Sequence, residues 1–121
     1  MMAILATILT VLVMVEHIYI LVLEMFLWTT KRARRIFGTT AELAEQTKVL
    51  AANQGLYNGF LAAGLAYGLL APNPVGFAFK VFFLACVVVA GVYGGMTANR
   101  RILLVQGGPA LLALLFVLLA R

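Results

Sequence analysis

The chain has 121 residues, of which 64% are hydrophobic and 11% are charged, and its nine Lys and Arg residues outnumber its four Asp and Glu residues. Soluble domains contain about 45–50% apolar and about 25% charged residues, so the composition excludes a soluble fold of this size. The basic residues cluster directly after apolar runs, which is typical of the cytoplasmic loops of membrane proteins. We therefore expect no nucleic-acid partner.

Four apolar segments follow one another along the chain, each close to the roughly 20 residues that a helix needs to cross a bilayer core. The first runs from about 3 to 28 and is followed by Lys31, Arg32, Arg34 and Arg35. No basic stretch precedes it and no cleavage site interrupts it, so we expect a retained membrane span rather than a signal peptide.

The connection that follows, residues 30–47, is predicted to be a cytoplasmic amphipathic segment that leads into the second helix. Thr39 and Glu42 have the spacing of a capping box, in which two side chains satisfy unpaired amides at a helix start. The second span is expected over 48–70. It has to end before Pro72 and Pro74, because proline lacks the amide hydrogen and disfavours helix in the residue before it.

The third and fourth spans are expected over 77–98 and 102–120, with Arg100 and Arg101 in the turn between them. The Gly-Gly-Pro run at 107–109 predicts a kink or a delayed start in the fourth span. The predicted fold class is therefore all-α, an integral membrane four-helix bundle formed by one domain of residues 1–121. With the basic loops 29–47 and 99–101 in the cytoplasm, both termini of this multi-pass cell-membrane protein lie outside.

Three ionisable residues lie in the first span, where a centrally placed charge costs roughly 2.5–3.5 kcal/mol. They are Glu16, His17 and Glu24. At about 100° per residue, His17 and Glu24 lie within about 20° of each other on one stripe, about 10 Å apart along the helix axis. Glu16 points about 100° away from His17. Ionisable groups inside a membrane are functional by default.

The second span carries a polar cluster and a separate ladder of small residues. The polar residues occupy one face about 140° wide, and lipid cannot satisfy their amide and phenol groups, so this face has to look into the bundle or a cavity. The small residues recur every four positions and are predicted to let helix backbones approach closely. The cluster consists of Asn53, Gln54, Tyr57 and Asn58, and the ladder of Ala51, Gly55, Gly59 and Ala63.

The polar residues of the first two spans are together predicted to form a cytoplasm-facing pocket that binds a small amphipathic or lipophilic molecule. Two alternatives stay open: a proton-coupled small-molecule transporter, and a structural or assembly role in which the polar groups hold the helices in register. One His and carboxylates without i, i+4 pairing make a poor ligand set, so no metal site is predicted. The predicted ligand-binding residues are Glu16, His17, Glu24, Asn53, Gln54, Tyr57 and Asn58.

The sequence carries no catalytic signature. It has no Ser-His-Asp spacing, no Gly-rich phosphate loop and no His-Glu-x-x-His motif, so catalytic residues and a cofactor stay unknown and enzyme activity stays open. The partners that we expect are membrane lipid and a small lipophilic ligand. A homo-oligomer is a further open alternative.

Several phrases of the sequence resemble a family of small bacterial membrane proteins known as domain of unknown function 1304. The phrases are Glu16-His17, the run Leu-Glu-Met-Phe-Leu-Trp at 23–28, Phe37-Gly38, and above all Lys-Val-Leu-Ala-Ala-Asn-Gln-Gly-Leu-Tyr-Asn-Gly at 48–59. The resemblance covers essentially the whole chain. It implies a four-span protein of the bacterial inner membrane with no assigned activity.

Two fainter resemblances point elsewhere. The chain is similar to the membrane-associated eicosanoid and glutathione enzymes, which have four spans and a basic first cytoplasmic loop. Glu45 and Asn53 have the eight-residue spacing of that family, while Gln46 and Leu56 stand where it has Arg and Glu. The chain also resembles the small multidrug exporters in its size and in Glu16, which matches their lone Glu in the first span.

The alternation of basic and neutral connections yields a topology prediction. A cysteine introduced as Lys31→Cys should react with a membrane-impermeant thiol reagent only after the membrane is opened, because the basic loop is cytoplasmic. Asn73→Cys, in the turn between the second and third spans, should react in intact cells. Labelling of Lys31→Cys in intact cells would contradict the predicted orientation.

Overall fold

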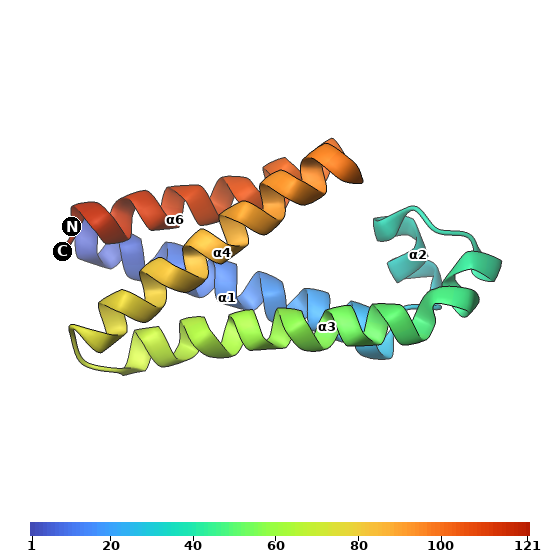
Figure 1. Cartoon of the computed structure of the whole chain (residues 1–121), viewed down its shortest axis with the longest axis horizontal. Coiled ribbons are helices and arrows are strands. Elements are labelled where there is room, and N and C mark those ends of the chain that lie inside the picture. Colours follow the sequence, from blue (N-terminus) through green and yellow to red (C-terminus); the bar gives the residue numbers. More distant parts are fainter. The chain divides into compact units, whose positions relative to one another are not determined.

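The computed structural model describes all residues 1–121, and it is helical with no β-strand. Figure 1 shows long helices joined by short connections. This confirms the all-α fold class. The elements are α1 (Met2–Phe26), α2 (Lys31–Phe37), α3 (Ala41–Leu70), α4 (Val75–Thr97), α5 (Arg100–Ile102), the π-helix η1 (Leu103–Gly107) and α6 (Gly108–Leu119).

Three stretches are long and apolar enough to cross a membrane: α1, α4, and the continuous stretch Arg100–Leu119 that comprises α5, η1 and α6. The chain therefore has the character of a multi-pass membrane protein. The helix α3 has 30 residues, more than the roughly 20 that a span needs. It lacks the apolarity of the other three, because amide side chains interrupt its apolar sequence.

The chain divides into two compact units whose borders fall inside α1 and α3. Unit 1 comprises Met1–Val15 and Leu61–Arg121, and unit 2 comprises Glu16–Phe60.

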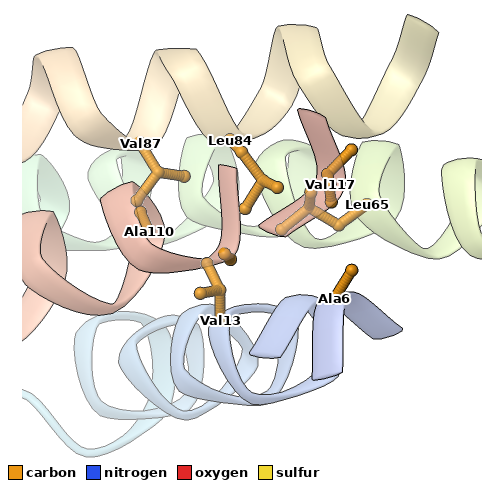
Figure 2. Close-up of a cluster of buried hydrophobic side chains, with 8 residues drawn as sticks. Ala6, Val13, Leu65, Leu84, Val87, Ala110 and Val117 are labelled. Atoms are coloured by element: carbon orange, nitrogen blue, oxygen red, sulfur yellow. The ribbon is translucent and has the colours of Figure 1, made fainter. Parts of the chain in front are cut away.

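Unit 1 has a core of small and branched apolar side chains. In Figure 2, Leu84 and Val87 of α4 lie beside Ala110 and Val117 of α6, with Leu65 of α3 next to Val117. Alanine at such positions allows the helices to pack closely. The full cluster of buried residues consists of Ala6, Val13, Leu65, Leu84, Val87, Ala110, Ala113 and Val117.

A close approach in unit 1 joins the backbones of α4 and η1. A Cβ atom added to Gly91 would lie 2.7 Å from both Cα and N of Gly107, so only glycine fits at this position. The neighbouring π-helical turn runs over Leu103–Gly107, where the amide of Gly108 donates to the carbonyl of Leu103. Pro109 follows it, and proline has no amide hydrogen to continue a regular helix. The structure thus places a π-helical turn at the run where the sequence predicts a kink.

Unit 2 consists of the last part of α1, the short helix α2 and the first two thirds of α3. The helix α2 has a cap at each end: Thr30 accepts a hydrogen bond from the amide of Ala33, and Gly38 ends the helix in the left-handed conformation with φ 70°. The hydroxyl that caps α3 belongs to Thr40, which accepts from the amide of Leu43 at 3.1 Å. The expectation that Thr39 performs this role is wrong by one residue.

The contact between Gly91 and Gly107 yields a stability prediction. Gly91→Ala should lower the free energy of unfolding in detergent micelles by about 1–3 kcal/mol, because the added methyl group has to push two backbones apart. Gly107→Ala is the matched control, since a Cβ atom there would lie at ordinary contact distances, 3.6 Å from Cδ1 of Leu103 and 3.8 Å from Gly91. The control should keep or slightly raise stability. Equal stability of the two variants would contradict the close approach.

Candidate functional site

The polar residues of unit 2 are positioned by a close contact between α1 and α3. A Cβ atom added to Gly55 would lie 2.7 Å from Cγ of Met25 and 3.0 Å from Cβ of Glu24. One added to Gly59 would lie 2.7 Å from Cδ1 of Leu21. Two of the small residues that recur along α3, Gly55 and Gly59, are therefore in close contact with α1. The absence of side chains at these positions sets the distance between the two helices.

Three polar residues are buried in unit 2: His17 is 1% exposed, Glu24 is 7% exposed and Asn58 is 8% exposed. Asn58 lies three residues after Gly55 and so shares its face of α3. Its amide nitrogen Nδ2 donates to Oε1 of Glu24 at 2.7 Å and to the carbonyl oxygen of Gln54 at 3.2 Å. This bond joins the polar residues of the first two long helices directly. His17 is buried on α1, about 10 Å along the helix axis from Glu24.

The other polar residues of α3 point away from α1. Asn53 and Tyr57 each lie two residues from Gly55, which places them about 200° around the helix from the contact with α1. Asn53, Gln54 and Tyr57 are exposed, and Tyr57 has 57% of its surface accessible. Asn53 donates from Nδ2 to the carbonyl of Val49 at 2.9 Å. The side chains of Gln54 and Tyr57 form no hydrogen bond within the chain.

The seven predicted site residues thus fall into three groups. His17, Glu24 and Asn58 are buried in unit 2, while Asn53, Gln54 and Tyr57 form an exposed polar face on α3. Gln54 connects the two groups, because its backbone carbonyl accepts from the buried Asn58 and its side chain is exposed. Glu16 stands apart. It is half-buried, and its Oε1 atom is buried without a hydrogen-bond partner.

The end of unit 2 that carries α2 is held together by Trp28. Its indole Nε1 donates to Oγ1 of Thr47 at 3.1 Å, which ties the residues after α1 to the first turns of α3. Its ring also lies 4.9 Å from the ring of Phe37, the last residue of α2. Tyr19 adds a second tie, since its hydroxyl accepts from Nε of Arg32 at 2.7 Å. These contacts fix α2 against the ends of the two longer helices.

The chemistry that this arrangement permits is hydrogen bonding and proton exchange. No group of three or more His, Cys, Asp or Glu side chains is placed to hold a metal ion. Glu24 uses one carboxyl oxygen to accept from Asn58, and its other oxygen has no hydrogen-bond partner in the chain. The exposed face of α3 therefore offers donors and acceptors at Gln54 and Tyr57 to a molecule that reaches it, whereas the acceptor at Glu24 is buried between α1 and α3.

Comparison with known proteins assigns the chain to a family. The family described as "Protein of unknown function (DUF1304)" matches residues 11–118. The chain belongs to this family. It is also similar to "Uncharacterized protein YpaA" of Lactococcus lactis subsp. lactis (strain IL1403), with 38% identity over 116 residues that cover 94% of this chain and 97% of that protein. No solved structure matches the chain.

Residues 11–118 include every polar residue of the candidate site. They also include three residues of unit 2 whose contacts the sequence does not predict: Tyr19, Arg32 and Thr47. The aromatic pair Phe26 and Trp28 at the end of the first span is suited to the headgroup region. The partners of Tyr19 and Trp28 lie 13 and 19 residues away, and no short-range periodicity links positions at such separations.

The bond between Glu24 and Asn58 yields a quantitative prediction. A double-mutant cycle with Glu24→Ala and Asn58→Ala should give a coupling energy of about 0.6 kcal/mol and at most about 1.7 kcal/mol, the range measured for hydrogen bonds between membrane helices. The cycle is measured by unfolding in detergent micelles. Glu24→Ala combined with Asn53→Ala is the matched control and should be additive, because Asn53 lies on the opposite face of α3. Additivity in both cycles would contradict the buried bond.

Proposed function

We propose that this member of the family is a four-span membrane protein that binds a small amphipathic molecule at the polar residues of unit 2. The observation that carries the proposal is the exposure of Gln54 and Tyr57, whose side chains have no hydrogen-bond partner within the chain. Polar groups in contact with lipid hydrocarbon are costly unless something satisfies them. A molecule with a polar group and an apolar body supplies both the hydrogen bonds and the apolar contact.

The proposal includes α3 as the fourth span. From Val49 to its last residue, Leu70, α3 has no charged side chain, and its charged residues Glu42, Glu45 and Lys48 all lie in its first turns. At about 1.5 Å per residue this uncharged part is about 33 Å long, enough for a hydrocarbon core about 30 Å thick. The connections 29–47 and 99–101 then lie in the cytoplasm of a multi-pass cell-membrane protein with both termini outside.

This placement gives the bound molecule a depth and a chemistry. Gln54 and Tyr57 lie about 8–12 Å along α3 from Val49, in the cytoplasmic half of the bilayer. The amide of Gln54 donates and accepts, and the phenol of Tyr57 does the same. The ring of Tyr57 lies 6.0 Å from that of Phe60, which continues the surface with an apolar group. The polar residues thus lie nearer the cytoplasmic surface than the apolar Phe60. A ligand with its polar group near that surface and its apolar body deeper in the membrane fits this arrangement.

A second candidate function is proton-coupled transport, and Glu16 favours it. A half-buried carboxyl group with one buried oxygen that lacks a partner is costly inside a membrane, and such groups serve proton relays in transporters. Transport would require that protons move with a substrate when reconstituted vesicles are given a pH gradient. Binding alone requires no such coupling, so Glu16→Gln separates the two functions by abolishing transport while leaving binding at α3 intact.

The ligand-binding proposal is tested on Tyr57. Tyr57→Phe removes one hydroxyl group and should reduce the amount of small molecule that copurifies in mild detergent by roughly fivefold to tenfold, the worth of one hydrogen bond. Tyr67→Phe is the matched control, because Tyr67 lies on the same helix and is 53% exposed. Native mass spectrometry reports the bound molecules of both variants.

Glu24→Gln provides the second arm of this test. It keeps an oxygen that accepts from Asn58 and removes the charge, so its melting temperature should be unchanged or raised, as is common where a functional site trades against stability. Retention of the copurifying molecule should fall. A lower melting temperature with unchanged retention, together with equal retention by the two Tyr variants, would assign the polar residues a structural role.

A further inference from the structure

We infer that α2 and the residue after its C-cap form a second binding site, which takes the phosphate group of a phospholipid at the cytoplasmic surface of the membrane. The site is a hollow of about 340 Å³ that is open to the surface. It lies outside the polar residues of α1 and α3 and does not require ligand binding there, while its place at the cytoplasmic surface rests on the proposed topology. Its lining consists of Lys31, Arg34, Arg35 and Thr39.

The charges of this hollow have no counter-charge in the chain. The structure has a single ion pair, between Lys48 and Glu45 on the exposed first turns of α3. Lys31, Arg34 and Arg35 therefore present three cations to one small volume without an acidic partner. Like charges gathered in this way repel one another, and an anion between them removes the repulsion.

The shape of α2 directs these cations to one side. At about 100° per residue, Lys31, Arg34 and Arg35 fall within an arc of about 100°. The opposite side of α2 is occupied by Ala33, which is fully buried, and by Phe37, which contacts Trp28. Arg34 is anchored through Nε, which donates to the carbonyl of Thr29 at 3.2 Å. Its two terminal amino groups remain to bind an oxyanion, the geometry in which Arg recognises phosphate.

Thr39 closes the hollow because Gly38 reverses the chain. With φ 70° at Gly38, the chain turns back and the amide of Thr39 donates to the carbonyl of Arg34 at 3.0 Å. The hydroxyl oxygen of Thr39 is buried and has no hydrogen-bond partner. A buried hydroxyl group without a partner calls for an explanation. A phosphate oxygen in the hollow would accept from it.

A role in orientation alone does not account for this arrangement. The preference for cytoplasmic Lys and Arg depends on the number of basic residues near a span, and requires no particular geometry. Arg32 shows the contrast within the same helix. Its Nε donates to the hydroxyl of Tyr19, and its guanidinium lies 5.7 Å from the centre of that ring. One basic side chain of α2 is thus bonded to another residue of the protein, and the other three line a common hollow.

The position of the hollow favours a phospholipid as the source of the phosphate. The site begins five residues after Phe26, the last residue of α1, and Phe26 and Leu27 are exposed apolar side chains at the end of the span. Lipid phosphates lie at this level of the bilayer, and basic clusters directly after a span attract anionic lipids. Acyl chains of the bound lipid would meet the exposed apolar residues, which a soluble phosphate compound would leave uncovered.

The experiment measures binding to the full chain in a neutral detergent by native mass spectrometry. Dihexanoylphosphatidic acid is the lipid probe, dihexanoylphosphatidylcholine is the zwitterionic control, and glycerol 3-phosphate is the soluble probe with the same phosphate group. We expect adducts with phosphatidic acid at the lowest concentration and weaker binding of the other two. Binding of glycerol 3-phosphate as tight as that of phosphatidic acid would overturn the phospholipid assignment.

Two variants, each of which removes one positive charge from α2, test whether the lipid binds in the hollow. Arg35→Gln should weaken the binding of phosphatidic acid about tenfold, the worth of a hydrogen bond to a charged group. Arg32→Gln should stay within about twofold of the parent, because Arg32 does not line the hollow. Equal losses in the two variants would overturn the proposal in favour of a general surface charge.

Thr39→Val is a third variant, and it tests whether the hydroxyl group of Thr39 contributes to binding in the hollow. It keeps the shape of the side chain and removes the hydroxyl, so it should weaken binding roughly threefold to tenfold. The melting temperature should not fall, because the hydroxyl has no partner in the chain. A fall in melting temperature with unchanged lipid binding would overturn the role of Thr39 in the site.

Discussion

Close contact between helix backbones, possible only where no Cβ atom stands between them, is the constraint on which both units depend. In unit 1 the backbone of Gly91 meets that of Gly107, and in unit 2 Gly55 and Gly59 meet Leu21 and its neighbours on α1. In lipid there is no hydrophobic driving force for helices to associate, so close van der Waals packing has to stabilise their contact. The polar chemistry follows from this geometry. Asn58 reaches Glu24 because the helices have already been brought together one turn away, at Gly55.

The same constraint divides the polar residues of α3 into two kinds. Those on the side of the glycines find partners within the protein, as Asn58 does with Glu24 and with the carbonyl of Gln54. Those on the far side either bond to the backbone of their own helix, as Asn53 does to the carbonyl of Val49, or have no hydrogen-bond partner in the chain. A protein that needed polar groups only to hold its helices together would gain nothing from the second kind, since an unpaired amide or phenol in a membrane costs free energy. This difference is the physical basis for the binding function that we propose.

Much of the fold could be predicted from the sequence, because the signals for helices in a membrane protein are local. Long apolar runs, prolines at Pro72 and Pro74 and basic residues after spans are all properties of neighbouring positions. The polar face of α3 could be predicted to exist for the same reason. The direction in which this polar face points could not be predicted, because a face about 140° wide does not reveal which of its edges contacts the neighbouring helix. The sequence did hold a clue: Asn53 and Tyr57 are two residues from Gly55, and so about 200° from it.

Other features could not be predicted because they depend on contacts between distant residues or on small energy differences. Thr39 and Thr40 are adjacent threonines with equal ability to cap a helix. The choice follows from Gly38, whose left-handed conformation directs Thr39 back to Arg34 and leaves Thr40 at the start of α3. A single residue in the left-handed region therefore determines both where α3 begins and which hydroxyl closes the basic hollow.

The short helix α2 shows how a loop of a membrane protein becomes a fixed structural element. A helix of seven residues is unstable by itself, because nucleation costs more than so few hydrogen bonds return. Here Thr30 and Gly38 satisfy its ends, and Trp28 packs on Phe37 while bonding to Thr47. These contacts hold the helix in one orientation, with its buried side toward the ends of α1 and α3. The direction of its cations is consequently set by the protein, whereas in a flexible loop the same charges would separate to reduce their repulsion.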